Sequence, residues 1–219
     1  MRTYTFQEGL GDTIFSGMRT VPVVDEGGAL TGRVVRGQIE GCESARTFRW
    51  ETPAGGATQI GVRKMTARSV LGRLLRPTYA VTHSGPQGEE GAGGMGTEPA
   101  EDEQAGVLKD RIGENILYFA VEGTVDGHRV VILEDWDGTV VMEVRTEGEG
   151  AKRRKRRIGR FSSGGLLTRT QVQVDEDVLQ ELCPGQAPTS TVLFGLMVLM
   201  PYIHRVHTEE SGLIEELLG

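Results

Sequence analysis

Six consecutive cationic residues are the most distinctive polar feature of the chain. Such a block can attract an anionic lipid leaflet, at about 1 kcal/mol per cation near the surface, or follow the phosphate backbone of a nucleic acid. It can also be a solvated hairpin loop, paired with acidic residues of the same chain. The run contains no aromatic side chain on which a base could stack. The candidate ligand-binding residues, for an anionic headgroup, are Lys152, Arg153, Arg154, Lys155, Arg156 and Arg157.

Two groups of possible metal ligands lack the spacing of a metal site. His204 and His207, in the sequence HRVH, could both reach one ion from a helix, but a third ligand is missing. We interpret them as polar residues that end a buried helix. Glu134, Asp135 and Asp137 suggest calcium, yet the later ligands of a calcium loop are absent, and a hairpin turn accounts for Asp137. The sequence therefore predicts no metal site.

No pattern in the chain indicates catalysis. Ser162 and Ser163 stand in RFSSGG, which is not the G-x-S-x-G elbow of serine hydrolases. Cys42 and Cys183 make no metal spacing and are expected to be free thiols of a cytoplasmic protein. Residues 1–12 contain one basic residue and no apolar run of the length that a signal peptide needs. We expect a cytoplasmic protein with no enzymatic activity and no cofactor.

The formal net charge of −7 comes mostly from one glycine-rich segment, residues 85–106. This segment holds six acidic residues and no basic one, so the remainder of the chain is close to neutral. Net charge therefore implies no strongly charged partner. Because the segment has no aromatic residue and little that can pack, we expect a mobile insertion in a single domain that comprises residues 1–219.

One stretch near the C-terminus must be surrounded by protein or lipid. No residue from Val192 to Ile203 is charged and nearly all are large and apolar, whereas a surface helix has only one apolar stripe. The run is shorter than the about 20 apolar residues that a bilayer requires. Thr189 or Ser190 could cap its start. We predict a buried central helix over residues 189–204.

The rest of the chain predicts short strands joined by glycine turns. Asp126-Gly127 and Asp137-Gly138 stand between apolar runs, which is typical of hairpins, and Ile116–Val121 is the strand expected before the first of them. We count about twelve strands. A sheet of that size closes to remove its edges, and a barrel that wide cannot be filled by its own side chains. The sequence predicts a mainly β fold: an about twelve-stranded closed antiparallel barrel that encloses the hydrophobic C-terminal helix.

The chain resembles the tubby-like C-terminal superfamily, which includes tubby domains, phospholipid scramblases and LURP-one-related proteins, and is most similar to prokaryotic members. The matching segments are Gly11–Phe15, Leu74–Tyr79, the strand–turn–strand pattern of Val130–Val144, and the hydrophobic helix. Residues 85–106 and 208–219 depart from the compact family form. The resemblance implies phosphoinositide binding, as in tubby domains, or lipid movement, as in scramblases. No motif carries over individual ligand residues.

These observations predict a non-enzymatic β-barrel binding module, cytoplasmic or peripherally attached to a membrane. Its expected ligand is an anionic phospholipid headgroup or a protein partner. A scramblase-like lipid transporter is an alternative, but it would need the central helix to span a membrane, and the apolar run is too short. A nucleic-acid-binding protein that uses residues 152–157 is a second alternative, against which the acidic balance of the chain argues.

Overall fold

The computed structural model describes residues 1–7, 20–64, 77–85, 103–110, 119–146, 154–162 and 170–218. The strands in these ranges are β1 (Arg2–Phe6), β2 (Val21–Val24), β3 (Leu30–Arg36), β4 (Cys42–Glu51), β5 (Ala57–Arg63), β6 (Thr78–Ser84), β7 (Glu103–Asp110), β8 (Ala120–Val125), β9 (His128–Glu134), β10 (Thr139–Thr146), β11 (Arg154–Ser162) and β12 (Gln171–Val174). They are followed by the helix α2 (Glu176–Leu182), the 3₁₀ turn η1 (Pro188–Ser190) and the helix α3 (Val192–Leu218).

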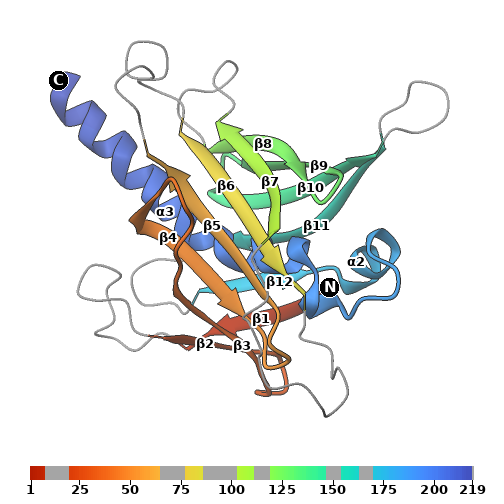
Figure 1. Ribbon diagram of the computed structural model, residues 1–219. Helices are drawn as coiled ribbons and strands as arrows, with labels where there is room; N and C mark the ends of the chain where they lie inside the picture. Colours follow the sequence, from red (N-terminus) through yellow and green to blue (C-terminus); the bar gives the residue numbers. More distant parts are fainter. Residues whose placement is uncertain are drawn as a thin grey trace, which may run out of the picture.

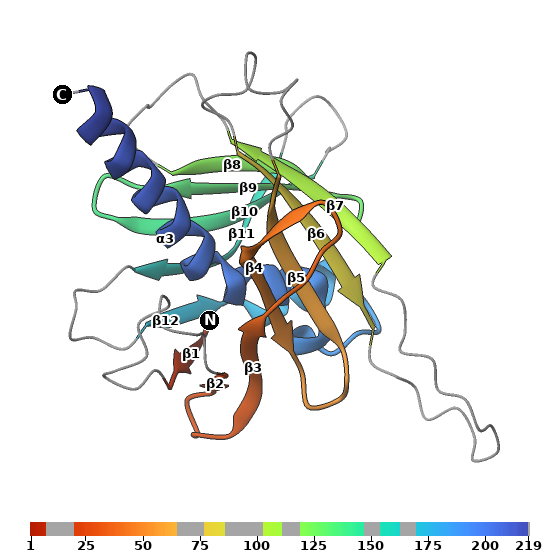
Figure 2. The same cartoon turned by 60° about the vertical axis from the view of Figure 1, so that its left-hand side comes forward.

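The strands form one closed barrel in which each strand pairs antiparallel with its neighbours in the sequence (Figures 1 and 2). The pairing of β1 with β12 closes the barrel, with Tyr4 opposite Val172. Side chains alternate between the lumen and the outside, as a pleated strand requires: in β1, Tyr4 and Phe6 are buried while Thr3 and Thr5 between and beside them are only half-buried. The predicted twelve-stranded closed antiparallel barrel is confirmed.

Two strand boundaries differ from the prediction. The expected strand Ile116–Val121 is described only from Phe119 onward, because residues 116–118 lie outside the described residues. Phe119 is not in a strand, and β8 starts at Ala120 and continues past Val121 through Gly123. A Cβ on Gly123 would lie 1.9 Å from the carbonyl oxygen of Val107, so glycine there permits close contact between β7 and β8. The predicted mobile insertion, residues 85–106, is too long, because Glu103 already pairs with His83 of β6; residues 86–102 lie outside the described residues.

The helix α3 begins close to the predicted start but extends far beyond the predicted end at residue 204. The Thr191 hydroxyl oxygen accepts a hydrogen bond from the Phe194 backbone N–H at 3.2 Å, so Thr191 caps the helix rather than Thr189 or Ser190. The last turns leave the barrel, as Figures 1 and 2 show. The uncharged run therefore marked most of the buried part of the helix and not the extent of the helix. Burial continues at His204 and Val206, and the exposed Arg205 between them does not interrupt helical hydrogen bonding.

Aromatic side chains fix α3 inside the barrel. Phe194 packs edge-on against Tyr4 of β1, with ring centroids 4.9 Å apart, and also contacts Trp50 of β4 at 5.8 Å. Two turns later, Tyr202 repeats the arrangement with Phe48 at 5.2 Å and Phe6 at 6.0 Å. Each aromatic pair of this geometry contributes about 0.5–1.5 kcal/mol to stability, in addition to the contribution from burying its surface. The same face of α3 therefore packs on β1 and β4 at two levels.

A glycine allows the helix to approach the barrel wall. A Cβ on Gly195 would lie 2.3 Å from Oγ1 and 2.5 Å from Cβ of Thr58 in β5. Rotation of the Thr58 side chain cannot relieve the second contact, because a Cβ position is fixed by the backbone. Gly195 therefore sets the distance between α3 and β5.

The short helix α2 connects the barrel wall to the central helix. Its start is capped by Asp175, whose Oδ1 accepts from the Val178 N–H at 3.2 Å. Glu176 accepts a hydrogen bond from the buried Tyr4 hydroxyl and lies 3.2 Å from Arg2 Nη1. Burial and the Glu176 carboxylate together raise the pKa of Tyr4. These contacts attach α2 to β1 at the seam of the barrel.

Replacing Gly195 with alanine should destabilise the protein. Alanine is the better helix former by about 1 kcal/mol, but the clash with Thr58 is an overpacking that costs about 1–3 kcal/mol. We expect a lower midpoint in urea denaturation. Gly85→Ala is the matched control, because a Cβ there meets nothing within 4 Å; equal midpoints for the two variants would contradict the close packing of α3 on β5.

Candidate functional site

The cationic run lies mostly in a strand and not in a loop. Residues 154–157 begin β11 and pair with the end of β10, where Lys155 is opposite Arg145. The alternative of a solvated hairpin loop is therefore wrong for these four residues. They are held in the sheet by their pairing with β10, and the strand is anchored further along by the buried side chains of Ile158 and Phe161. Lys152 and Arg153 lie outside the described residues.

A β-bulge divides the cations of the run between two environments. Met142 is opposite Gly159 and Glu143 is opposite Arg157, which leaves Ile158 as an extra residue in β11. Lys155 and Arg157 are exposed. Arg156 is half-buried instead, and its Nη1 lies 2.5 Å from Oε2 of Glu181 in α2, which raises the pKa of Arg156. The described part of the run therefore does not act as one block of free charge.

Three cations from three adjacent strands lie directly opposite one another on the outer face of the barrel. Arg145 of β10 pairs in register with Lys155 of β11 and also with Arg129 of β9. We call Arg129, Arg145 and Lys155 the basic row. In the sequence, Lys155 is 10 residues and Arg129 is 16 residues away from Arg145, so only the register of the sheet brings the three together. The sequence identified Lys155 alone, as one of the six candidate residues.

The charge of the basic row is only partly compensated. Glu122 lies 3.5 Å from Arg129, and Glu143 lies 3.9 Å from Lys155. The Nε atom of Arg145 is buried and makes no hydrogen bond within the part of the chain that the structure describes. Like charges directly opposite each other in a sheet are destabilising. The row is thus a place where the fold accepts an electrostatic cost.

Two further cations extend this face along β11. Arg157 lies opposite Glu143, and Arg160 lies opposite Val141 and donates from Nε to the Gln173 side-chain oxygen at 2.8 Å. Both are exposed. The outer surface formed by β8 to β11 thus presents five cations among the described residues, against the carboxylates of Glu122 and Glu143. We call this surface the basic face.

The histidine pair is placed inside the barrel and not on this surface. His204 is buried in α3 and packs edge-on against Phe119 and Phe161, and its Nε2 lies 3.2 Å from Oε2 of Glu134 without the alignment of a hydrogen bond. Burial and the neighbouring His204 lower the pKa of His207. The expectation that these residues end the helix is wrong, because α3 continues to Leu218.

The three carboxylates that suggest calcium have separate partners. Glu134 accepts a hydrogen bond from the Phe119 N–H at 3.0 Å and faces His204. Asp137 accepts from the Thr139 N–H at 2.9 Å, which lowers the pKa of Asp137. Asp135 contributes backbone hydrogen bonds to the same turn. The interpretation of Asp137-Gly138 as a hairpin turn is confirmed.

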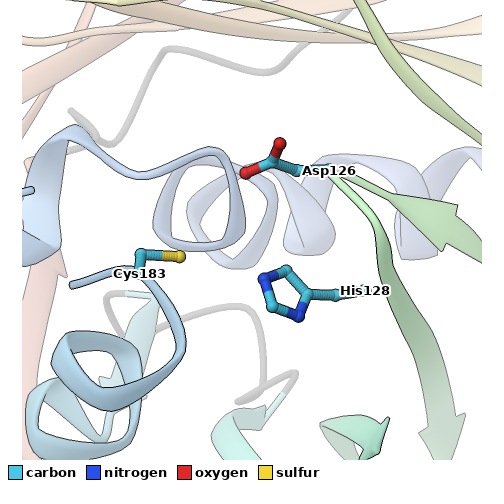
Figure 3. A group of neighbouring side chains, drawn as sticks. All are labelled: Asp126, His128 and Cys183. Carbon is cyan, nitrogen blue, oxygen red and sulfur yellow. The ribbon is translucent and has the colours of Figure 1, made fainter.

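A second cluster of polar side chains was not identified from the sequence. Asp126 and His128 from the turn between β8 and β9 point toward Cys183 at the end of α2 (Figure 3). Their ligand atoms all lie within 4.8 Å of one another. Burial raises the pKa of the Cys183 thiol, and the Asp126 carboxylate adds to that shift. No spacing rule could find this cluster, because Cys183 is remote in sequence from the two other residues.

No protein-family model matches the chain, and neither does any curated protein or solved structure. Among the residues that the structure describes, no helix combines the length and apolar character needed to cross a membrane.

Neutralising the centre of the basic row should stabilise the protein. Arg145→Gln removes repulsion with two neighbours, so we expect the free energy of unfolding to rise by about 0.2–1 kcal/mol at low ionic strength. The gain should shrink in high salt, which screens exposed charges. Arg33→Gln is the control, since Arg33 lies opposite Glu51 with Nε 2.8 Å from Oε2. Equal effects of the two substitutions at low salt would refute uncompensated repulsion in the row.

Proposed function

We propose that this protein is a non-enzymatic binding module whose basic face binds anionic phospholipid headgroups. The observation that carries the proposal is the basic row, in which Arg129, Arg145 and Lys155 lie opposite one another on adjacent strands. A phosphate placed over the row would interact with cations from three strands at once.

The spacing of the row suits phosphate oxygens. Neighbouring strands lie about 4.7–4.9 Å apart, and arginine offers paired N–H donors that match two oxygens of one phosphate. A bound anion would therefore offset repulsion that the sheet otherwise retains.

The two carboxylates on the face limit how strongly it can bind. Glu143 and Glu122 reduce the local charge, so binding should be of modest strength and sensitive to salt. Each cation near an anionic leaflet contributes about 1 kcal/mol. A cytoplasmic protein that attaches reversibly to a membrane surface agrees with these magnitudes. The resemblance to tubby-like proteins favours the same class of ligand, and it remains a resemblance.

Vesicle binding tests the proposal. Wild-type protein should co-sediment at low salt with vesicles of phosphatidylcholine that contain phosphatidylserine or a phosphoinositide, and not with pure phosphatidylcholine vesicles. The triple variant Arg129→Gln, Arg145→Gln, Lys155→Gln should lose most of this binding, since it removes about 3 kcal/mol of attraction at about 1 kcal/mol per cation. Its melting temperature should not fall.

A second triple variant controls for net charge. Arg33→Gln, Arg46→Gln, Arg49→Gln also removes three cations, but each lies within 4 Å of a Glu43 or Glu51 carboxylate on β4. It should retain vesicle binding. Absence of vesicle binding by the wild type at low salt, or equal losses in both triple variants, would overturn the proposal. Row-dependent binding to DNA or RNA without vesicle binding would replace it with nucleic-acid binding.

A further inference from the structure

We propose that Asp126, His128 and Cys183 form a binding site for a single zinc ion, which joins α2 to the turn between β8 and β9. The inference is independent of the proposed function. We call these three residues the Asp–His–Cys cluster. They supply one oxygen, one nitrogen and one sulfur ligand, all of which zinc accepts in proteins.

The backbone holds each of the three residues firmly. Asp126 and Gly127 have φ values of 49° and 73°, the left-handed conformation of a tight hairpin turn, and the Asp126 N–H donates to the Ala105 carbonyl of β7 at 2.8 Å. His128 pairs with Val125 across that turn. The Cys183 N–H donates to the Leu179 carbonyl at 2.8 Å and ends α2.

The side chains converge on a common point without bonding to one another. Figure 3 shows the carboxylate, the imidazole and the sulfur directed toward the space between them. Their ligand atoms lie within 4.8 Å of one another, yet none of the three side chains makes a hydrogen bond or ion pair with a described residue. Three ligand atoms of these types at these separations are close enough to bind one ion together.

The distances fit a tetrahedral ion after a small contraction. With bonds of about 2.3 Å to sulfur and 2.0–2.2 Å to nitrogen or oxygen, ligands of zinc lie about 3.3–3.6 Å apart. The separations in the cluster exceed this by at most about 1.5 Å, which rotation of the side chains can supply.

The ligand set selects among metals. A thiolate does not suit calcium or magnesium, which take oxygen ligands, whereas a mixed set of oxygen, nitrogen and sulfur suits zinc. Three protein ligands leave a fourth tetrahedral position, and because Asp126 is exposed, water can occupy it. Cys183 lies on the buried side of the site.

The structural consequence is a cross-link between elements remote in the sequence. Asp126 and His128 belong to one hairpin of the barrel wall, while Cys183 ends the helix that leads to η1 and α3. An ion that binds the folded protein and not the unfolded chain stabilises it in proportion to the logarithm of its concentration. We therefore expect zinc to raise the melting temperature.

Cobalt(II) substitution is the direct test, performed with tag-free, chelator-treated full-length protein. Cobalt takes the same tetrahedral ligands and gives an absorption band from thiolate-to-metal charge transfer. One equivalent of Co²⁺ should produce this band, and Zn²⁺ should abolish it by displacement. Cys183→Ser should eliminate the band. Cys42→Ser is the matched control, because Cys42 is the only other cysteine and its Sγ lies 3.6 Å from the Gly61 carbonyl oxygen.

Asp126→Asn separates loss of a ligand from loss of folding. Asparagine tolerates the left-handed conformation, and Asn-Gly is the preferred pair for this turn, so the variant should melt like metal-free wild type. Its zinc affinity, and that of His128→Gln, should fall about tenfold or more, because loss of even an indirect contact to a metal costs about 10–100-fold. Absence of the cobalt band in the wild type, its persistence in Cys183→Ser, or unchanged affinity in Asp126→Asn would overturn the proposal.

Discussion

The fold depends on filling a lumen that twelve strands make too wide for their own side chains. Barrels of about eight strands are filled by residues of the wall, and wider ones need another occupant. Here the occupant is α3, which approaches β5 at Gly195 and packs against β1 and β4 through Phe194. The apolar surface of the helix and the inner face of the wall each require the other, since either alone would expose the residues of the core to water.

Because the helix supplies the core, the outer face of the wall is free to carry charge. In β9 to β11 the inward residues, such as Ile132 and Met142, are fully buried, while the outward positions hold the basic row. Sheet register then places Arg129, Arg145 and Lys155 together at a cost in electrostatic repulsion. A binding surface can be built in this way without any change in the core.

The turn between β8 and β9 connects the two candidate sites. His128 and Arg129 are neighbours in sequence, and successive strand residues point to opposite faces. His128 faces Cys183 in the Asp–His–Cys cluster, while Arg129 belongs to the basic row. An ion that fixes α2 against this turn would also fix the end of β9 that carries Arg129. Metal binding and anion binding would then share one structural element.

The sequence by itself predicted a closed barrel of about twelve strands, the hairpin turns at Asp126 and Asp137, and the buried helix, because turn conformation and all-round apolarity are properties of short segments. It did not determine the true end of α3. It also did not determine that residues 154–157 form a strand, because these polar residues are held in the sheet by their pairing with β10. The basic row and the Asp–His–Cys cluster were decided only by tertiary structure. Both join residues remote in the chain through strand register and helix placement, and no local pattern encodes either of these.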